Sequence, residues 1–334
     1  MIPRSRQSWQ IPDWQNELAT AVRDPAELLQ RLHLPSDALP GMQLPHQQFK
    51  LRVPQSYLSR IKPGDPNDPL LLQILPQAQE AIAAAGYISD PVGDLDAMAV
   101  PGLLHKYHGR VLLITTGACA IHCRYCFRRH FPYQESQLNP AQWQAALAYI
   151  EQHPDITEVI LSGGDPLSLS DQRLAGLLED IGRLKQLKRV RIHTRLPSVI
   201  PSRVTPELLE TLAELPQTVV MVLHINHANE IDEHVAAAVK RLKDSGLTLL
   251  NQAVLLKGIN DSAEALAVLS ESLFAIGILP YYLHLLDPVA GAMHFDVDAE
   301  TATTLIDALR QRLPGYLIPC LVKEIPGHPH KLPV

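Results

Sequence analysis

The sequence predicts an α/β protein built as a partial TIM-type (βα)6 barrel, with a helical N-terminal extension and a short C-terminal segment. From residue 110 onward, short apolar runs rich in β-branched residues alternate six times with longer amphipathic patterns, which is typical of parallel strands joined by helical crossovers. A polar or glycine-rich cluster follows each apolar run. These clusters favour a barrel over an open doubly wound sheet, because the loops at the carboxyl ends of barrel strands converge on one mouth.

The order of the elements divides the chain into three parts. Residues 1–100 contain short helical patterns, such as 24–34 and 70–85, and we expect them to wrap onto the larger body. Residues 101–315 hold the strand–helix core, and residues 316–334 form the C-terminal segment. The expected strands cover residues 111–115, 158–162, 189–194, 219–225, 248–256 and 280–286. The expected helices cover residues 140–153, 170–184, 206–215, 232–245, 262–277 and 298–313.

Composition and charge restrict the class of protein. Of the 334 residues, 46% are hydrophobic and 19% are charged, which is typical of a globular protein and excludes disorder along the whole chain. The formal net charge of −6 provides no basic field for nucleic acid or an anionic membrane surface. The sequence has no apolar run of the roughly 18 residues that a membrane span needs, and its N-terminus lacks a secretory signal pattern. We therefore expect a cytoplasmic protein.

Three of the four cysteines lie within eight residues, directly after the first predicted strand. Cys119, Cys123 and Cys126 have a C-x3-C-x2-C spacing. Clustered thiols in a cytoplasmic chain favour metal or redox chemistry over disulfides, and thiolates this close together can share one iron–sulfur cluster. Three ligands leave one iron of a four-iron cube open to a substrate or cofactor. The alternative is a structural zinc site completed by a nearby histidine, His122 or His130.

At these cysteines the sequence resembles the radical S-adenosylmethionine (SAM) superfamily, whose C-x3-C-x2-C motif follows the first barrel strand. The resemblance implies a [4Fe-4S] cluster whose open iron chelates the amino and carboxylate groups of SAM. One electron, from an external donor through the cluster, then cleaves SAM to a 5′-deoxyadenosyl radical. The resemblance also implies SAM contacts from the segment Ser162, Gly163, Gly164 and Asp165. Glycine lets the backbone approach a ligand closely, although an ordinary strand-to-helix turn explains this segment equally well.

A longer resemblance covers residues 100–334. The stretches that are similar, in order, to the lysine 2,3-aminomutase family are PGLLHKYHGRVLLITTGACAIHCRYCFRRHF, LSGGDPL, RLPSVIPSRVTPEL, HINHANEI, LLNQAVLLKGIND and PYYLHLLD. That family uses SAM, an iron–sulfur cluster and pyridoxal 5′-phosphate (PLP) to move the α-amino group of lysine to the β-carbon. The position that matches its PLP Schiff-base lysine is Lys331, after a proline–glycine segment. Here His-Pro-His at 328–330 replaces the glycine run of the lysine-degrading members.

The family resemblance also implies residues that hold the substrate and PLP. Arg128 matches the arginine for the α-carboxylate, which a guanidinium binds with two parallel hydrogen bonds. Asp261 and Glu324 match two carboxylates for the remote ammonium, and such a pair argues against an acidic substrate such as glutamate. The stretch that matches the PLP-phosphate segment contains Lys106, Tyr107 and Arg110. A charged turn that faces an interface explains this stretch nearly as well.

Within the family, the segment LRVPQSYLSRI and the lead-in PGLLHKYH resemble the enzyme that makes (R)-β-lysine from (S)-α-lysine for modification of translation elongation factor P. This implies a functional link to elongation factor P and its lysyl ligase. Catabolic members extend beyond the PLP lysine, whereas this chain stops at Val334. The alternatives are a catabolic enzyme acting on free lysine, a PLP-independent radical SAM maturase, and a non-enzymatic iron–sulfur electron carrier.

The remaining histidines and the fourth cysteine carry weaker signals. The histidine spacings match no zinc site closely, so we predict hydrogen-bonded roles in the pocket or at the surface. The histidines concerned are His105, His108, His224, His227, His284, His294, His328 and His330. Cys320 has no partner in the sequence, and we predict that it is a buried free thiol.

Overall fold

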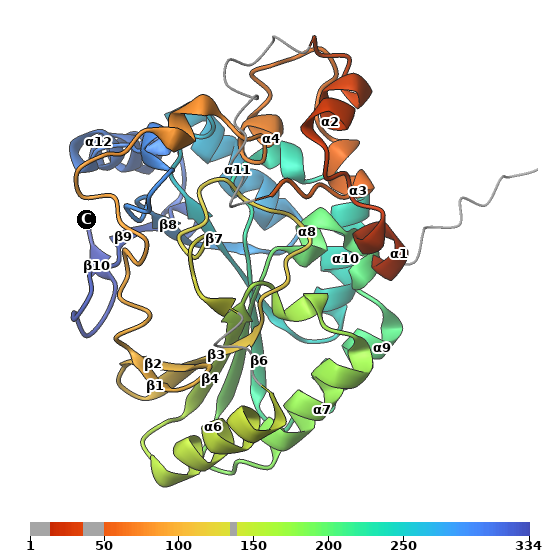
Figure 1. The fold of residues 1–334 in the computed structure, drawn as a ribbon, viewed down its shortest axis with the longest axis vertical. Helices are drawn as coiled ribbons and strands as arrows, with labels where there is room; N and C mark the ends of the chain where they lie inside the picture. The colour runs from red at the N-terminus through yellow and green to blue at the C-terminus, as the bar shows by residue number, and fades with distance from the viewer. Residues whose placement is uncertain (1–13, 36–49, 134–138) are drawn as a thin grey trace, which may run out of the picture.

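The strand order identifies the architecture as a partial barrel. The computed structural model describes residues 14–35, 50–133 and 139–334, and within them ten strands form one sheet in chain order from β1 to β10. Strands β3 to β9 are parallel to one another, and antiparallel strands extend both edges. A doubly wound sheet reverses its strand order at a switch point, which this sheet does not do in the described residues. Figure 1 shows α6, α7, α9 and α10 around the outside of the sheet.

All six predicted strand–helix units are present. The strands are β3 Arg110–Thr116, β4 Glu158–Gly163, β5 Arg189–Thr194, β6 Thr218–Leu223, β7 Thr248–Val254 and β8 Leu279–His284. The helices are α6 Pro140–Gln152, α7 Asp171–Gly182, α9 Pro206–Ala213, α10 Glu233–Asp244, α11 Ala263–Ala275 and α12 Ala299–Arg310. Ser170, Asp232 and Asp298 cap the starts of three helices by accepting a backbone N–H three residues on, which satisfies an otherwise unpaired donor.

An apolar core packs against the sheet and is continuous with the N-terminal region. All six residues of β4 are buried, as expected for a parallel strand covered on both faces. The same hydrophobic core contains Leu161 and Leu223 of the barrel together with Leu28, Tyr57 and Leu70 of the N-terminal region. Each fully buried leucine contributes roughly 1.5–3 kcal/mol of transfer free energy. The N-terminal region therefore packs onto the barrel as part of one core.

The N-terminal region contains short helices, as predicted. They are α1 Trp14–Ala19, α2 Pro25–Arg31, α3 Gln55–Leu58, α4 Pro69–Leu72 and the 3-10 helix η1 Ala78–Ala81. Helix α2 lies within the predicted 24–34 pattern, and the predicted 70–85 pattern overlaps α4 and η1 as separate short helices, because α4 ends before Pro76. Proline lacks the N–H that would continue a helix and disfavours helical geometry in the residue before it.

Four short strands were not predicted. Strands β1 Met98–Val100 and β2 Leu103–Tyr107 precede β3, and strands β9 Cys320–Lys323 and β10 Leu332–Pro333 end the sheet on its other edge. The sheet thus crosses the expected boundaries at residues 100 and 315. The other short helices are η2 Pro166–Ser168, α8 Leu196–Val199, η3 Pro201–Arg203, η4 Ala228–Glu230, η5 Met293–Phe295 and η6 Gly315–Leu317.

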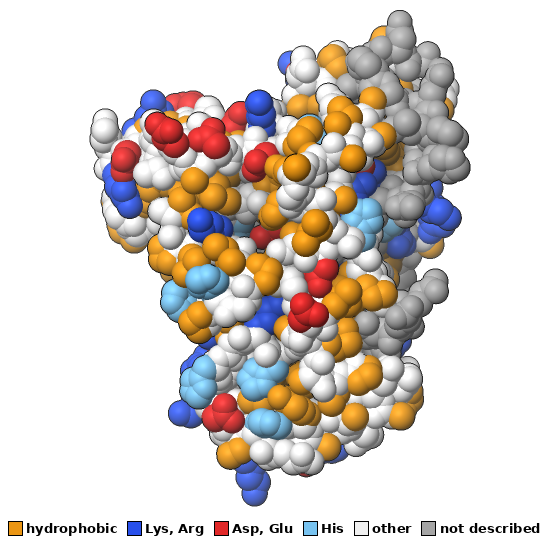
Figure 2. All heavy atoms as spheres, turned by 60° about the vertical axis from the view of Figure 1, so that its left-hand side comes forward, with side chains coloured by type: hydrophobic (Ala, Val, Ile, Leu, Met, Phe, Trp, Pro, Cys, Tyr) orange, Lys and Arg blue, Asp and Glu red, His pale blue; other side chains and the backbone are white. Residues whose placement is uncertain are grey.

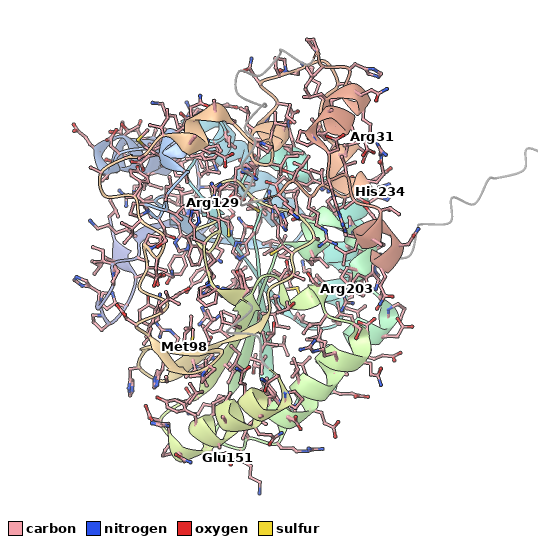
Figure 3. The ribbon with its side chains drawn as sticks, viewed as in Figure 1. Arg31, Met98, Arg129, Glu151, Arg203 and His234 are labelled. Atoms are coloured by element: carbon pink, nitrogen blue, oxygen red, sulfur yellow. The ribbon has the colours of Figure 1, made fainter. Side chains whose placement is uncertain are left out.

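Two further observations complete the fold. Cys320 is free but exposed at the start of β9, so the prediction that it is buried is wrong; in that strand the two middle residues are buried and the two outer ones face solvent. Arg203 is fully buried, and its guanidinium lies 4.4 Å from the centre of the Trp14 ring, which ties α1 to the barrel (Figure 3). None of the helices in the described ranges has the length and apolar character to cross a bilayer.

Candidate active site

A pocket of about 440 Å³ occupies the inside of the barrel and reaches the cysteines and the C-terminal segment. It collects every site residue predicted from the sequence except Asp261. The predicted residues that line it are Lys106, Tyr107, Arg110, Cys119, Cys123, Cys126, Arg128, Ser162, Gly163, Gly164, Asp165, Glu324 and Lys331. Residues far apart in the chain, such as Lys106 and Lys331, therefore face one cavity.

The glycines of the segment 162–165 pack against the loop that carries the cysteines, residues 117–126, here called the cysteine loop. Gly163 has a φ of +114°, and a Cβ built there lies 2.6 Å from the carbonyl oxygen of Thr116. A Cβ on Gly164 overlaps the carbonyl of Ala118, while the N–H of Asp165 donates to that same oxygen at 2.8 Å. A side chain at either glycine would push the two loops apart. The close approach seen here is between two backbones.

Asp165 holds the neighbouring strand end in place. Its carboxylate accepts hydrogen bonds from Thr194 Oγ1 at 2.7 Å, from the N–H of Arg195 at 2.7 Å, and from the N–H groups of Leu167 and Leu196. Burial raises the pKa of Asp165 to about 6, although these hydrogen bonds oppose the shift. Because four protein donors already occupy this carboxylate, its contribution is to fix the end of β5 beside the cysteine loop.

The three clustered cysteines fit an iron–sulfur cluster. Cys119, Cys123 and Cys126 are free, partly buried and line the same pocket. Burial raises the pKa of the Cys119 thiol, and it raises that of Cys126 to about 11, with the other cysteines adding to both shifts. Iron bound at these sulfurs would supply the positive charge that the thiolates need. Three thiols facing one cavity match the ligand set of a four-iron cluster with one open iron.

The alternative zinc site has no support in the geometry. His122 donates from Nδ1 to the Lys50 carbonyl at 2.6 Å, and His130 Nε2 donates to the Ala290 carbonyl at 3.1 Å, so these nitrogens bind backbone oxygens and are not metal ligands. Among the described residues, no group of three histidine, cysteine or acidic side chains is arranged around a single ion. A cluster does not require that arrangement, because each of its thiolates binds a different iron.

A chain of alternating charges crosses the pocket. Lys331 Nζ contacts Glu324 Oε2, and Glu324 Oε1 binds Lys106 Nζ at 2.9 Å. Lys106 also binds Asp94 Oδ1 at 2.6 Å, and Asp94 Oδ2 binds Arg128 Nε at 2.6 Å. Arg128 then reaches Ser162 Oγ at 3.1 Å. This charge chain connects the C-terminal lysine with the glycine segment beside the cysteine loop.

The acidic pair at the lysine end of the pocket is Asp287 and Glu324. Asp261 does not line the pocket; it lies partly exposed in the loop after β7, whereas its neighbour Asn260 is buried. Burial, and then the charge of Glu324, raise the pKa of Asp287 to about 7. Glu324 is also buried, but the charges of Lys331 and Lys106 outweigh that burial and lower its pKa to about 2.

The residues expected around the PLP phosphate differ in how many donors they have available. The ammonium of Lys106 donates to the Val92 carbonyl and to Glu324 and forms an ion pair with Asp94, so it is already engaged by three groups. Arg110 instead places its guanidinium 4.6 Å from the centre of the Tyr107 ring, a contact with the ring face that leaves its N–H groups available. Of the two basic residues, Arg110 is therefore the better phosphate ligand in this structure.

Of the histidines predicted to have hydrogen-bonded roles, His224 and His284 line the pocket, together with His193, which the sequence did not single out. Burial lowers the pKa of all three, that of His224 to about 3. The prediction is wrong for His294, because neither of its ring nitrogens has a hydrogen-bond partner among the residues that the structure describes. Outside the pocket, His105 Nδ1 lies 2.9 Å from the Tyr149 hydroxyl, and the His153 ring stacks on the Tyr149 ring. Figure 2 shows histidine side chains on the face where β2 and α6 lie.

Sequence comparison places the chain in a family. Residues 113–269 match the radical SAM superfamily. An "L-lysine 2,3-aminomutase" of Haemophilus influenzae is 49% identical over 96% of this chain and 94% of the relative, and that of Escherichia coli is 47% identical over the same shares. The chain belongs to the lysine 2,3-aminomutase family. The L-lysine 2,3-aminomutase of Clostridium subterminale, another member, is 35% identical over 96% of this chain and 77% of its own length.

Membership of this family makes the protein a radical SAM enzyme, and it implies a [4Fe-4S] cluster and SAM. Among solved structures, a radical SAM methyltransferase from Sphaerobacter thermophilus covers 66% of this chain and 68% of its own at 18% identity, with a TM-score of 0.48.

The N-terminal region supplies a layer of contacts around the cysteine loop that the sequence did not reveal. Arg124 and Arg129 both pair with Glu80 of η1. Arg52 donates to the Cys119 carbonyl at 2.9 Å. Asp94 orients Arg128 from the same region. These residues lie far from the motif in sequence, so the motif gives no indication of them.

Two other pocket residues that sequence reasoning missed did carry a signal. Asp287 lies in the cluster LDPVAG after β8, and Arg195 lies in the cluster HTRLP after β5. Both clusters follow predicted strands, at the edge where barrel sites form. The position of these clusters after a strand therefore indicated pocket residues, although the match to the family favoured Asp261 over Asp287.

Proposed function

We propose that this protein is a PLP-dependent lysine 2,3-aminomutase, an isomerase that converts (S)-α-lysine to (R)-β-lysine. The observation that carries the proposal is that Lys331 and the three clustered cysteines line one pocket, in a chain 47–49% identical to relatives named for this activity. When bound, the cluster with SAM supplies a carbon-centred radical, and PLP supplies a conjugated ring over which an unpaired electron spreads.

Lys331 would hold PLP covalently through its ε-amino group. It lies in the turn before β10, the strand that pairs with β9, and its Nζ contacts Glu324. Glu324 would hold this amine in place as its ion-pair partner rather than as a base, because a carboxylate with a lowered pKa accepts a proton poorly. Arg110 would bind the phosphate of PLP, and the face of the Tyr107 ring would hold the guanidinium in position by stacking against it.

Arg128 would bind the α-carboxylate of lysine. Asp94 and Ser162 hold two edges of its guanidinium, which fixes its plane in the pocket wall. Glu324 and Asp287 would bind the remote ammonium, because they are the carboxylates that line the pocket around Lys331. This assignment replaces Asp261 by Asp287 and keeps the electrostatic argument against an acidic substrate.

Reconstitution without oxygen tests the proposal. The protein with iron and sulfide restored is incubated with lysine, SAM, PLP and a one-electron reductant, and the products are separated by chiral chromatography. We expect (R)-β-lysine and an absorption band of bound PLP that Lys331→Ala abolishes. A PLP-independent maturase would cleave SAM without that band, and an electron carrier would hold the cluster without cleaving SAM. Either result, with the cluster confirmed by EPR, contradicts the proposal.

We further propose that the product serves the modification of translation elongation factor P in the cytoplasm. The segments LRVPQSYLSRI and PGLLHKYH support this branch, as does the higher identity to the Haemophilus and Escherichia relatives than to the Clostridium one. Elongation factor P and its lysyl ligase are incubated with the amino acid made by this enzyme or with α-lysine. Faster modification with the enzymatic product is expected, and equal rates would favour a catabolic role on free lysine.

A further inference from the structure

Arg195 contacts a sulfur that the proposed function assigns to the cluster. Its guanidinium donates from one terminal nitrogen to Cys123 Sγ at 2.7 Å and to the Tyr125 hydroxyl at 2.8 Å. Arg195 is 7% exposed, so the contact lies in the protein interior. A buried guanidinium stays protonated, because its ordinary pKa lies above 12. The positive charge of this guanidinium therefore lies in a fixed position beside the sulfur of Cys123.

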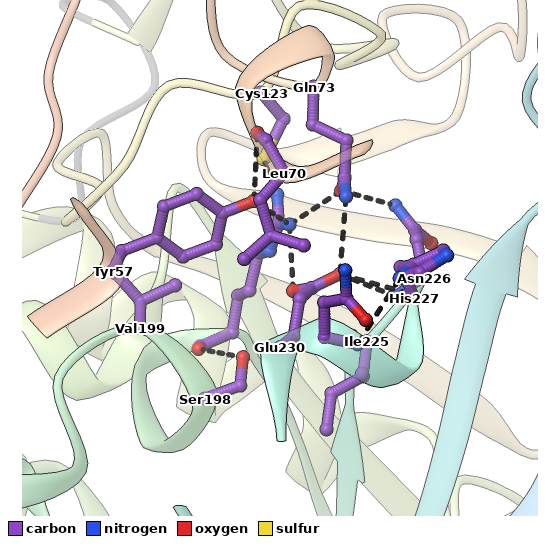
Figure 4. Close-up of polar contacts among 12 residues, drawn as sticks. Tyr57, Leu70, Gln73, Cys123, Ser198, Val199, Ile225, Asn226, His227 and Glu230 are labelled. Carbon is purple, nitrogen blue, oxygen red and sulfur yellow. Dashed lines mark hydrogen bonds and ion pairs between the residues drawn. The ribbon is translucent and has the colours of Figure 1, made fainter. Parts of the chain in front are cut away.

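The other terminal nitrogen of Arg195 is bound by Gln73 and Glu230, which Figure 4 shows with Cys123 and Asn226. It donates to Gln73 Oε1 at 2.7 Å and to Glu230 Oε2 at 2.9 Å. Glu230 is fully buried, and its second oxygen accepts the N–H groups of Asn226 and His227. The carboxylate is thus held on the side of the arginine that faces away from the sulfur. Glu230 therefore holds the guanidinium of Arg195 in position and partly neutralises its positive charge.

We propose that Arg195 is a positioning residue of the iron–sulfur site, which raises the reduction potential of the cluster by donating to Cys123 Sγ, and that Glu230 moderates this effect. The inference rests on the proposed cluster ligands and does not depend on lysine or PLP. One-electron reduction adds negative charge to the cluster, and the electron comes from an external donor. A hydrogen bond to a ligand sulfur and a nearby positive charge stabilise the reduced state. Burial strengthens both interactions.

A different role is also compatible with the same contacts. Arg195 lies 3.4 Å from the Tyr57 hydroxyl and binds Gln73, and both residues belong to the N-terminal region. Its charge could serve only to hold that region onto the barrel. The two roles predict different behaviour of the cluster potential, because a purely structural contact has no reason to shift the potential in a charge-dependent direction.

The test is a reductive titration of the reconstituted protein with dithionite and redox dyes, followed by EPR, without SAM, PLP or lysine. Arg195→Gln is expected to lower the ratio of reduced to oxidised cluster at a fixed potential by on the order of tenfold, which is about 59 mV for one electron. Arg195→Lys keeps the charge and is expected to recover most of the shift. Glu230→Gln removes the opposing charge and is expected to raise the potential.

Arg60→Gln is the matched control. The side chain of Arg60 is 6% exposed and belongs to the same network, but it donates to the Glu230 and Val199 carbonyls rather than to a sulfur. It is expected to shift the potential much less than Arg195→Gln. The inference is overturned if Arg195→Gln keeps the cluster at the wild-type potential, or if Arg195→Gln and Glu230→Gln shift the potential in the same direction.

Iron and sulfide analysis separates failures of this inference from failures of the proposed function. If Arg195→Gln does not hold a cluster, Glu230→Gln decides: a raised potential supports the inference and an unchanged potential overturns it. A wild-type protein that holds no cluster overturns the cluster ligands and this inference together. A wild-type protein that holds the cluster but makes no β-lysine contradicts the proposed function alone, and the potentials still decide the role of Arg195.

Discussion

The two ends of the pocket are held in different ways. At the cysteine end, Cys123 lies in a loop that β4, β5 and the N-terminal region all contact, through residues such as Asp165, Arg195 and Glu80. At the lysine end, Lys331 belongs to a hairpin whose last strand, β10, is two residues long. One end is fixed by contacts from distant parts of the chain, whereas the other depends on a short edge hairpin.

This difference relates to the chemistry proposed for each end. The cysteine end would hold a cluster that must stay in one place through many electron transfers. The lysine end must let Lys331 leave Glu324 when PLP binds and exchange again when substrate arrives. Buried, multiply bonded groups resist rearrangement, whereas an edge hairpin opens at low cost in free energy. The following experiments test how separate the two ends are.

The largest effect is expected from removing a cluster ligand. Cys123→Ala should eliminate the cluster and lower activity by about 10³-fold or more, because no other group in the proposed site generates the radical. Iron content, EPR and the lysine assay measure the effect. Cys320→Ala is the control, since this cysteine is exposed on β9 outside the pocket. Equal loss of iron from both variants would disprove the ligand assignment.

The next largest effect is expected at the lysine end. Lys331→Ala should lose the absorption band of bound PLP while the iron content stays at the wild-type level, because the two ends are held by different parts of the chain. Lys323→Ala is the matched control, an exposed lysine of β9 in the same hairpin. If Lys331→Ala also loses iron, the two ends are not independent.

Between the two ends lies the proposed carboxylate anchor. Arg128→Gln should raise the KM for lysine by about 10- to 100-fold, since a hydrogen bond to a charged group contributes roughly 1.5–3 kcal/mol. Asp94→Asn should raise the KM less, because it only removes the residue that orients Arg128. Steady-state kinetics at saturating SAM measure both. A larger effect from Asp94→Asn would mean that the aspartate contributes more than orientation.

The acidic pair is expected to give a smaller effect on the same kinetics. Asp287→Asn should raise the KM for lysine, because it removes one of the two carboxylates proposed for the remote ammonium. Asp261→Asn should have the smaller effect of the two, since Asp261 does not line the pocket. The reverse order would restore the assignment that the sequence match favours.

The smallest expected effect is on stability without cofactors. The pKa of Asp287 is raised to about 7 from an ordinary 3.8, so between these pH values the folded state binds this proton more tightly than the unfolded state does. The contribution of Asp287 to the free energy of unfolding therefore falls as pH rises from about 4 to 7. Glu324 behaves oppositely: its pKa is lowered to about 2 from 4.5, so its contribution is present above about 4.5 and is lost as pH falls toward 2. The free energy of unfolding is measured with urea at a series of pH values. Its fall between about pH 4 and 7 should be smaller in Asp287→Asn, and its fall toward pH 2 should be smaller in Glu324→Gln. Parallel profiles for the two variants would contradict these opposite signs.

The sequence predicts the barrel because its strands and helices carry strong periodicity, and all six units were found. It does not predict β9 and β10, because strands of four and two residues are too short for an alternating pattern. The cysteine ligands follow from their spacing in one loop. Asp94 and Glu80 do not, because their contacts with that loop arise only when the N-terminal region folds back on the barrel. Asp287 was missed because two acidic residues follow neighbouring strands, and only the fold shows which one lines the pocket.

The charge chain from Lys331 to Arg128 has a consequence for selectivity. Each charged group of this charge chain already has a partner of opposite charge, so a bound amino acid has to exchange partners rather than find free ones. Its carboxylate would take Arg128 from Asp94, and its distal ammonium would take Glu324 from Lys331. A ligand with a carboxylate but no distal ammonium would take Arg128 from Asp94, leave that aspartate without this partner and gain no contact with Glu324. Amino acids without a distal amine would thus bind weakly, chiefly because they break an internal ion pair without replacing it.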